Sequence, residues 1–374
     1  MENKVQKSLI IIFCLWFLAL MATGLVSSKF STYNDGGKVC AVKKQLPFYR
    51  WDSFWYTSIS RHGYSFSLEK NSSIAFFPAY PAVIKLVHTV SGAKEDQISL
   101  VLNILFSALI VFFLYRLALM DYSDVVSRNI VLVWLLFPPA YFLLSGYPEA
   151  MFVFLAVLSF YLARKKAWLW AGIVAGILAV TKPYGVFMLP ALFVEYFESN
   201  AWDWRVFYRK FTWLPLLLPL VTFGGFVLFN FLKFGNALAF LSAQHTWGRT
   251  LGSPLSALFS EFKFYLIDNP IMTGSNFPYL IYLFSFVFSI FAFALSWKKI
   301  RNSYLVFSGL LLLSAFLTGT LTSWGRYMFL GFPILMGPAI YLSRKKWLLW
   351  IYLFFSALVL LFCASFFARC YPFE

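Results

Sequence analysis

Acidic side chains are scarce in this sequence, so those that stand outside apolar runs are candidates for chemistry. Only 15 of the 374 residues are Asp or Glu. Asp52 stands in the most polar stretch, residues 50–81, among the aromatic residues Trp51, Phe54 and Trp55. A carboxylate in such surroundings is poorly solvated, which favours proton uptake from an attacking hydroxyl. The pattern favours Asp52 as a general base, and a purely structural helix cap is the alternative.

The residues after Asp52 predict a short helix over 53–62, with Asp52 as its N-cap and Gly63 as the left-handed residue that ends it. Pro81 suits the first position of a second interfacial helix. One face of the first helix is suited to lying on a bilayer surface. That face would carry Trp51, Trp55, Ile59 and His62.

Three further charged residues stand in short turns between apolar runs. Glu149, in the turn 145–150 (SGYPEA), opens an apolar run, where the helix dipole favours an anion. Lys182 (TKPYG) and Arg326 (SWGRY) are the only basic residues in the short turns that alternate with the strongly basic connections. Dipole compensation for Glu149 and snorkelling to the interface for the two cations are the structural alternatives.

A second polar cluster, QHTWGR, occupies residues 244–249. The sequence thus offers two carboxylates and three cations, which we expect to meet at one membrane face as a phosphate site beside a carboxylate. The candidate phosphate ligands are Arg326, Lys182 and Arg249. We expect sugar or acceptor contacts from Trp51, Trp55, His62, Gln244, His245 and Trp247. The alternative for His245 is a histidine whose hydrogen bonds are satisfied locally, and the alternative for Arg249 is a plain surface charge.

The elements that must position these groups are membrane-spanning helices. Hydrophobic residues make up 61% of the chain and charged residues 12%, which excludes a soluble domain, where about 45–50% and about 25% are typical. We expect one all-α domain over residues 1–374, with about eleven crossings of about 20 residues each. The apolar runs are residues 8–26, 98–119, 129–144, 148–163, 167–181, 184–197, 211–232, 277–296, 303–321, 327–342 and 347–367. The short runs around Tyr147 and Lys182 are expected to form tight hairpins or re-entrant segments.

Basic residues concentrate in alternate short connections, and the net charge is +16. The positive-inside rule places those connections and the N-terminus in the cytoplasm and the C-terminus outside. The two long connections, about 27–97 and about 233–276, then fall outside. We therefore expect a multi-pass cell-membrane protein whose candidate residues gather on the external face.

Metal and thiol chemistry find little support in the sequence. The four Cys and three His residues show no zinc-site spacing. Two external carboxylates are ligands suited to Mg²⁺ or Mn²⁺, but a cation-lined phosphate site makes a metal unnecessary, and we expect neither metal nor cofactor. Cys40 and Cys370 both fall on the outer side, where the environment would permit them to pair.

Ordered short motifs span most of the chain. They are Trp51-Asp52 with Ile59, His62-Gly63-Tyr64, Ala75-Phe76-Phe77-Pro78 with Pro81, Ser145-Gly146-Tyr147 with Glu149-Ala150, Thr181-Lys182 with Gly185, and Arg326-Tyr327. Because these motifs occur in this order, the chain resembles the GPI mannosyltransferase 2 (PIG-V) family of the GT-C glycosyltransferase superfamily.

The resemblance implies an enzyme that transfers a sugar, usually mannose, from a polyprenyl-phosphate carrier to a lipid- or protein-linked acceptor on the non-cytoplasmic face. It assigns Asp52 to the family's proposed catalytic base and Glu149 to the acidic residue of a Gly-Tyr-x-Glu turn. Pro148 stands where the family tends to have Ser, and Lys182-Pro183-Tyr184 where Arg and small polar residues are usual. Lys in place of Arg loses bidentate phosphate contact, so the donor pocket should differ in shape. The short chain predicts a prokaryotic relative with a different acceptor.

The resulting hypothesis is a single inverting displacement. Asp52 removes the acceptor proton, the cations compensate the leaving phosphate, and Glu149 assists the base or binds a sugar hydroxyl. The main alternative is a polytopic transporter or lipid flippase, but such proteins place ionisable residues near the bilayer midplane, whereas here they stand at the ends of apolar runs. A scaffold without chemistry is a third reading, and it predicts that Asp52, Glu149 and Arg326 are individually replaceable.

Overall fold

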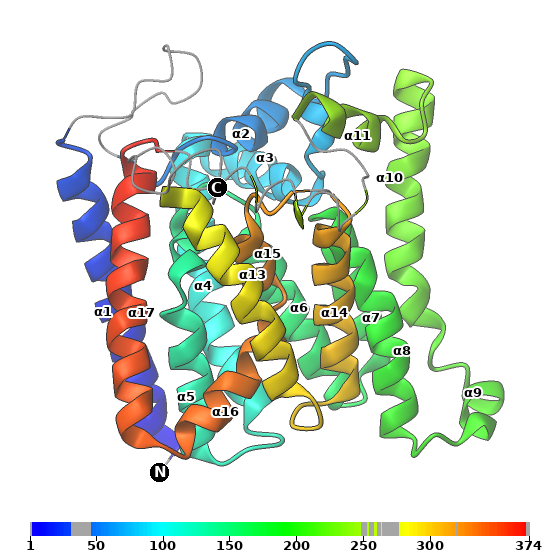
Figure 1. Ribbon diagram of the computed structural model, residues 1–374. Helices are drawn as coiled ribbons and strands as arrows, with labels where there is room; N and C mark the ends of the chain where they lie inside the picture. Colours follow the sequence, from blue (N-terminus) through cyan, green and yellow to red (C-terminus); the bar gives the residue numbers. More distant parts are fainter. Residues whose placement is uncertain are drawn as a thin grey trace.

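The fold is a bundle of helices, seen in a computed structural model that describes residues 2–30, 46–247, 253, 258–259, 263, 277–318 and 320–371 (Figure 1). Every regular element in these ranges is helical, which confirms the predicted all-α class. The elements are α1 (Glu2–Ser27), α2 (Ser53–His62), η1 (Ser73–Ala75), α3 (Ala79–Ser91), α4 (Glu95–Ala118), α5 (Asp124–Leu135), η2 (Pro138–Leu144), α6 (Glu149–Arg164), α7 (Trp168–Ala179), η3 (Pro183–Phe187), α8 (Met188–Ser199), α9 (Trp204–Lys210), η4 (Leu214–Leu217), α10 (Leu218–Phe234), α11 (Ala239–Ser242), η5 (Ala243–Trp247), α13 (Phe277–Ser296), α14 (Asn302–Phe316), α15 (Trp324–Leu330), η7 (Phe332–Leu335), α16 (Met336–Ser343) and α17 (Lys346–Ala368).

Four helices in the described part are long and apolar enough to cross a membrane. They are Lys7–Ser27, Glu95–Ala118, Leu214–Phe234 and Lys346–Ala368. Large apolar side chains on their outer faces are exposed, as for Leu18 and Phe354, each 60% exposed. Such a surface suits contact with lipid rather than with water.

Several predicted crossings are broken in the structure. The run 129–144 is split into α5 and η2, which meet at an angle of 79° next to Pro138 and Pro139. The run 327–342 is divided among α15, η7 and α16, and the run 303–321 becomes a helix that ends at Phe316. Proline lacks an amide donor and clashes with the preceding turn, which explains the first break and the 3₁₀ geometry around Pro333. The number of crossings therefore stays a prediction.

The two ends of the bundle differ in character (Figure 1). The beginning of α1 and the end of α17 lie at opposite ends, and α2, α3 and α11 cap the end at which α17 finishes. The described parts of both long connections thus share one end, as the charge pattern predicts. The location of this end outside the cell remains a prediction from the charge pattern.

The opposite end is tied together by ion pairs between connections. Glu195 is fully buried and accepts hydrogen bonds from Arg301 Nε at 2.8 Å and from Ser303 Oγ at 2.6 Å. Arg164 pairs with Asp121 at 2.5 Å and approaches Glu195 at 3.5 Å. These contacts join the ends of α4, α6, α8 and α14, so the bundle is clamped far from the capped end.

Candidate active site

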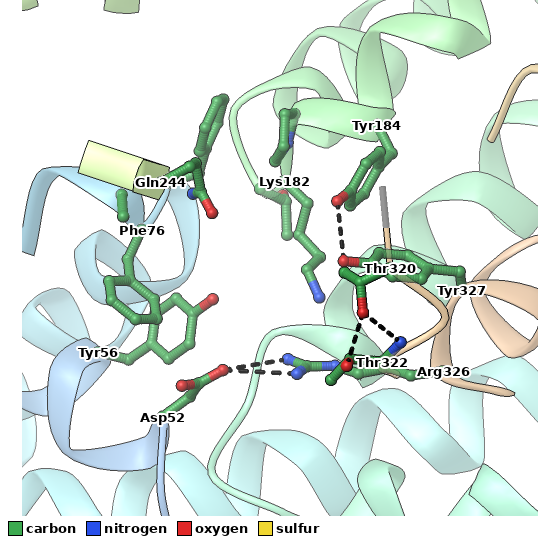
Figure 2. A pocket seen from close by; sticks show the side chains of 14 residues that line it. Asp52, Tyr56, Phe76, Lys182, Tyr184, Gln244, Thr320, Thr322, Arg326 and Tyr327 are labelled. Carbon is green, nitrogen blue, oxygen red and sulfur yellow. Dashed lines mark hydrogen bonds and ion pairs between the residues drawn. The ribbon is translucent and has the colours of Figure 1, made fainter. Parts of the chain in front are cut away.

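A small polar cavity of about 210 Å³ lies beside α2, one of the helices that cap the bundle. Figure 2 shows the side chains that line it. It is enclosed by α2, the segment after η1, the turn that follows α7 and the start of α15. Its lining consists of Asp52, Tyr56, Ala75, Phe76, Phe77, Thr181, Lys182, Pro183, Tyr184, Gln244, Thr320, Thr322, Arg326 and Tyr327.

Asp52 directly precedes α2, and the residues before it fix its position. The guanidinium of Arg50 is buried and donates to the carbonyl oxygens of Leu46, Tyr49 and Ala368, which fixes the segment before Asp52 against the end of α17. Trp51 has a φ of 45°, an unfavourable backbone conformation for a large residue. The strained residue therefore stands immediately before the carboxylate that enters the cavity.

The predicted helix over 53–62 is confirmed, but two of its details are wrong. The Asp52 side chain makes no capping hydrogen bond, because it turns towards Arg326 instead. Gly63 has a positive φ of 76° with a ψ of −159°, which is not the left-handed helical conformation. Pro81 is also not the first residue of its helix, because α3 begins at Ala79.

Arg326 forms the cationic floor of the cavity. Its Nη1 and Nη2 atoms each lie 3.5 Å from Asp52 Oδ2, and its Nε donates to Glu149 Oε1 at 2.5 Å. The guanidinium carbon also lies 4.7 Å from the ring centre of Tyr147 and 5.0 Å from that of Phe142. Pairing on one edge and stacking on the face leave this side chain little freedom, so the Nη atoms are presented to the cavity.

Glu149 lies beneath the cavity rather than in it. The prediction that it opens a helix is confirmed, because α6 begins at this residue. Its side chain is fully buried, and Oε1 accepts from both Lys182 Nζ and Arg326 Nε at 2.5 Å. It does not line the cavity, which differs from the expectation of direct contact with a sugar. Glu149 instead brings two cations together where they would otherwise repel each other.

Lys182 enters the cavity from the turn between α7 and η3 (Figure 2). Burial, together with the nearby charge of Arg326, lowers the pKa of Lys182 to about 8, and Glu149 acts in the opposite direction. The Ala79 amide donates to the Val180 carbonyl at 2.9 Å, so the first long connection is docked onto the same turn. Lys182 is therefore positively charged below about pH 8 and loses its charge as the pH rises above that value.

The turn that carries Tyr147 and Glu149 is supported from below by Asn103 of α4. The Asn103 amide nitrogen donates to the carbonyl oxygens of Ser145 and Tyr147, and its oxygen accepts from Tyr80. Gly146 allows this turn to approach α2, since a Cβ at Gly146 would lie 2.9 Å from Ser53 Cβ. The Tyr147 hydroxyl in turn accepts a hydrogen bond from the Asp52 amide at 3.2 Å. Two segments that are distant in sequence are thus locked together at the site.

Sequence reasoning missed a hydroxyl-rich wall of the cavity. Tyr184 donates to the Tyr327 hydroxyl at 3.2 Å, and Thr320 and Thr322 are joined by a hydrogen bond of 2.8 Å (Figure 2). Tyr56 faces them from α2, and burial keeps its pKa well above the usual range, so its phenol stays protonated. With 21 Tyr in the chain, residue type alone gave no signal; adjacency to the Lys182 and Arg326 motifs could have found Tyr184 and Tyr327.

The remaining predicted contacts divide into two groups. Gln244 lines the cavity, whereas His62 and His245 are exposed and Trp51 and Trp55 stand outside its lining. The predicted bilayer face of α2 is wrong, because Ile59 is buried and Trp55 stacks on Phe76 with ring centres 5.5 Å apart. These apolar groups find protein partners instead of lipid.

Some predictions fall beyond what the structure describes. Arg249, Cys40 and the side chain of Trp247 lie outside the described residues. Cys370 is in a disulfide. Within the described ranges no cluster of three or more His, Cys, Asp or Glu residues has a geometry suited to a metal.

Comparison with solved structures finds distant similarities. The oligosaccharyltransferase of Archaeoglobus fulgidus, in complex with Zn and sulfate, shares 14% identity over 95% of this chain and 53% of its own, with a TM-score of 0.41. ArnT from Cupriavidus metallidurans, bound to undecaprenyl phosphate, shares 14% identity over 87% of this chain and 59% of its own, with a TM-score of 0.48. The chain thus spans little more than half the length of either protein. Comparison with curated proteins finds no match.

A family match covers the segment that carries most of the site. Residues 38–189 match the family described as Mannosyltransferase (PIG-V). This segment contains Asp52, Glu149 and Lys182, while Arg326 follows it in the chain. The resemblance seen in the short motifs is confirmed for residues 38–189, where the chain is similar to this family.

Proposed function

We propose that this protein transfers a mannosyl residue from a polyprenyl-phosphate-linked donor to a lipid- or protein-linked acceptor at the non-cytoplasmic membrane face. The observation that carries the proposal is the pairing at the cavity floor, where the Asp52 carboxylate faces the Nη atoms of Arg326 at 3.5 Å. A base for a hydroxyl and a cation for a phosphate thus stand side by side. The match to the mannosyltransferase family supports the choice of sugar.

The proposed reaction needs only these groups. The acceptor oxygen attacks the anomeric carbon while its proton passes to the Asp52 carboxylate. The bond between the anomeric carbon and the phosphate oxygen breaks, and its electron pair leaves with the phosphate. Arg326 and Lys182 stabilise the charge that develops there, and the single displacement inverts the anomeric carbon.

Charge balance explains how the donor would engage this site. Asp52 and Glu149 together offset Lys182 and Arg326 when no phosphate is bound. Because Glu149 already occupies the Nε edge of Arg326, a donor phosphate would compete with Asp52 for the Nη atoms. Donor binding would then release the carboxylate for the acceptor hydroxyl. In this account Glu149 is a positioning residue, and the hydroxyl wall opposite Asp52 contacts the sugar.

Lys182 gives the proposed reaction an alkaline limit. Since its pKa is lowered to about 8, its charge is present below that pH and is lost as the pH rises above it. We expect kcat/KM, which reports the free enzyme, to fall progressively above about pH 8. Lys182→Arg should extend the plateau to higher pH, because a guanidinium keeps its proton throughout this range. Identical alkaline limbs in the two proteins would show that another group sets the limit.

Deleting the gene and comparing extracted lipids and surface glycans by mass tests the proposed activity. We expect one species to lose a single hexose, and complementation with the intact gene should restore it. Accumulation of a complete, unmodified cargo lipid on the inner leaflet would instead indicate a flippase. Unchanged lipids and glycans would contradict both activities.

A further inference from the structure

The short helix α9 (Trp204–Lys210) projects from the end of the bundle opposite the capped end, beyond the end of α8 (Figure 1). None of its residues is buried. Its position is nevertheless fixed, because Phe207 stacks on Trp213 with ring centres 4.4 Å apart and the Trp213 indole donates to the Phe207 carbonyl at 2.8 Å. The α9 hairpin, residues 200–213, is therefore a defined projection whose outer face is left uncovered by the described part of the chain.

The outer face of α9 combines aromatic rings with cations. Trp204 and Tyr208 are 56% and 69% exposed and, being four residues apart, lie on the same side of the helix. Arg205 and Arg209 form an exposed row beside them for the same reason, and an exposed lysine follows at position 210. The hairpin contains one carboxylate, Asp203, which accepts a hydrogen bond from the Arg205 amide at 2.9 Å and so caps the helix. The exposed face is thus strongly positive.

Other cations at this end of the bundle are used inside the protein. Arg301 Nε donates to the buried carboxylate of Glu195 at 2.8 Å, and Arg164 pairs with Asp121. Both contacts hold helices of the bundle together. The cations of α9 are instead exposed, so they are available to groups outside the protein.

The place of α9 in the chain indicates its depth relative to the membrane. The candidate span Leu214–Phe234 begins just after α9 ends at Lys210. Phe211 and Leu214, which are 57% and 49% exposed, lead from the helix into that span. A short helix at the end of a crossing lies at the level of the lipid headgroups, where Trp, Tyr and basic side chains are all stabilised.

We propose that the α9 hairpin binds the headgroups of anionic phospholipids, with the rings of Trp204 and Tyr208 among the headgroups and the row of cations on their phosphates. The inference goes beyond the proposed function and does not depend on sugar transfer. A phosphatidylcholine headgroup carries an ammonium that offsets its phosphate, so clustered cations favour phosphatidylglycerol, which has a net negative charge. The position beside a crossing favours lipid over a protein partner.

Photo-crosslinking from the exposed face identifies the partner. The full-length protein carrying Tyr208→p-benzoylphenylalanine is reconstituted into vesicles of equal amounts of phosphatidylglycerol and phosphatidylcholine. After irradiation, adducts on the α9 peptide are identified by mass. We expect phosphatidylglycerol adducts to outnumber phosphatidylcholine adducts by about tenfold or more at low salt, because each cation near an anionic surface contributes about fivefold to affinity. High salt should reduce this preference, since it screens exposed charges.

Neutralising the row of cations tests its part in the recognition. In the same crosslinking protein, Arg205→Gln, Arg209→Gln and Lys210→Gln are combined. We expect the ratio of the two lipid adducts to fall to about one, while both lipids still react because the aromatic side of α9 is unchanged. Thermal unfolding should match that of the parent, since these three side chains are exposed.

A second triple variant removes the same charge elsewhere at this end. Lys166→Gln, Lys298→Gln and Lys346→Gln change exposed lysines in the turns before α7 and α14 and at the start of α17. We expect this control to keep the preference for phosphatidylglycerol. An equal loss in both triple variants would show a general effect of net charge and would overturn the assignment to α9.

The composition of the adducts decides the remaining alternatives. Adducts with another protein or with a second copy of this chain would identify α9 as a protein-binding surface and overturn the proposal. Equal labelling of the two lipids in the parent, or no lipid adduct, would likewise overturn it.

Discussion

Asp52→Asn should lower kcat for sugar transfer by about 10²- to 10⁴-fold, the usual contribution of a general base. The amide keeps the size of the side chain but does not take up the acceptor proton. The parent carboxylate makes no helix cap, so its loss should leave α2 in place. Transfer is measured with a fixed donor and acceptor in detergent, alongside thermal unfolding of the same preparation.

Glu69→Gln is the matched control for this substitution. Glu69 is an exposed carboxylate of the same long connection and does not line the cavity. We expect it to transfer sugar at the parent rate. A fully active Asp52→Asn protein would remove Asp52 from the mechanism, and equal losses in both variants would point to a general electrostatic effect of the connection.

Glu149→Gln should have the largest effect on stability. The change leaves Lys182 and Arg326 buried side by side without the carboxylate that joins them. Breaking a buried ion pair in this way costs about 3–5 kcal/mol in the free energy of unfolding. Both the unfolding temperature and kcat/KM should fall, because the guanidinium loses the contact that orients it.

Removing one charge of each sign is the control. In the double variant Glu149→Gln with Lys182→Met, Asp52 and Arg326 still pair, and the buried site is neutral again. We expect the double variant to unfold at a higher temperature than Glu149→Gln alone, while donor affinity stays low for want of Lys182. Losses that simply add would show that the two side chains are not energetically coupled.

Much of the site was predictable because ionisable residues are rare in this chain. Asp52, Lys182 and Arg326 each stand out against apolar surroundings, and the structure brings all three to one cavity. Turn residues likewise predicted the helix after Asp52 and the start of α6 at Glu149. These local predictions hold because few other polar groups lie nearby to form alternative hydrogen bonds.

What could not be predicted depends on contacts between distant segments. Asp52 turns towards Arg326 instead of capping its helix, and these two residues are 274 positions apart. Glu149 pairs with the same arginine, 177 positions later in the chain. Trp55 and Ile59 have the periodicity of a lipid-facing surface, but the aromatic side chain of Phe76 covers the former. The chemistry of Pro138 and Pro139 explains why α5 ends in a bend, but the angle of 79° follows from packing between distant segments.

The order in which the charged partners are synthesised has a consequence for biogenesis. Glu149 and Lys182 are 33 residues apart, whereas Arg326 lies 177 residues after Glu149. During translation a carboxylate and an amine would meet early, and the guanidinium would arrive only when the last third of the protein emerges from the ribosome. A chain released prematurely would hold the early pair but lack the guanidinium, so the charged floor of the cavity is completed only late in assembly.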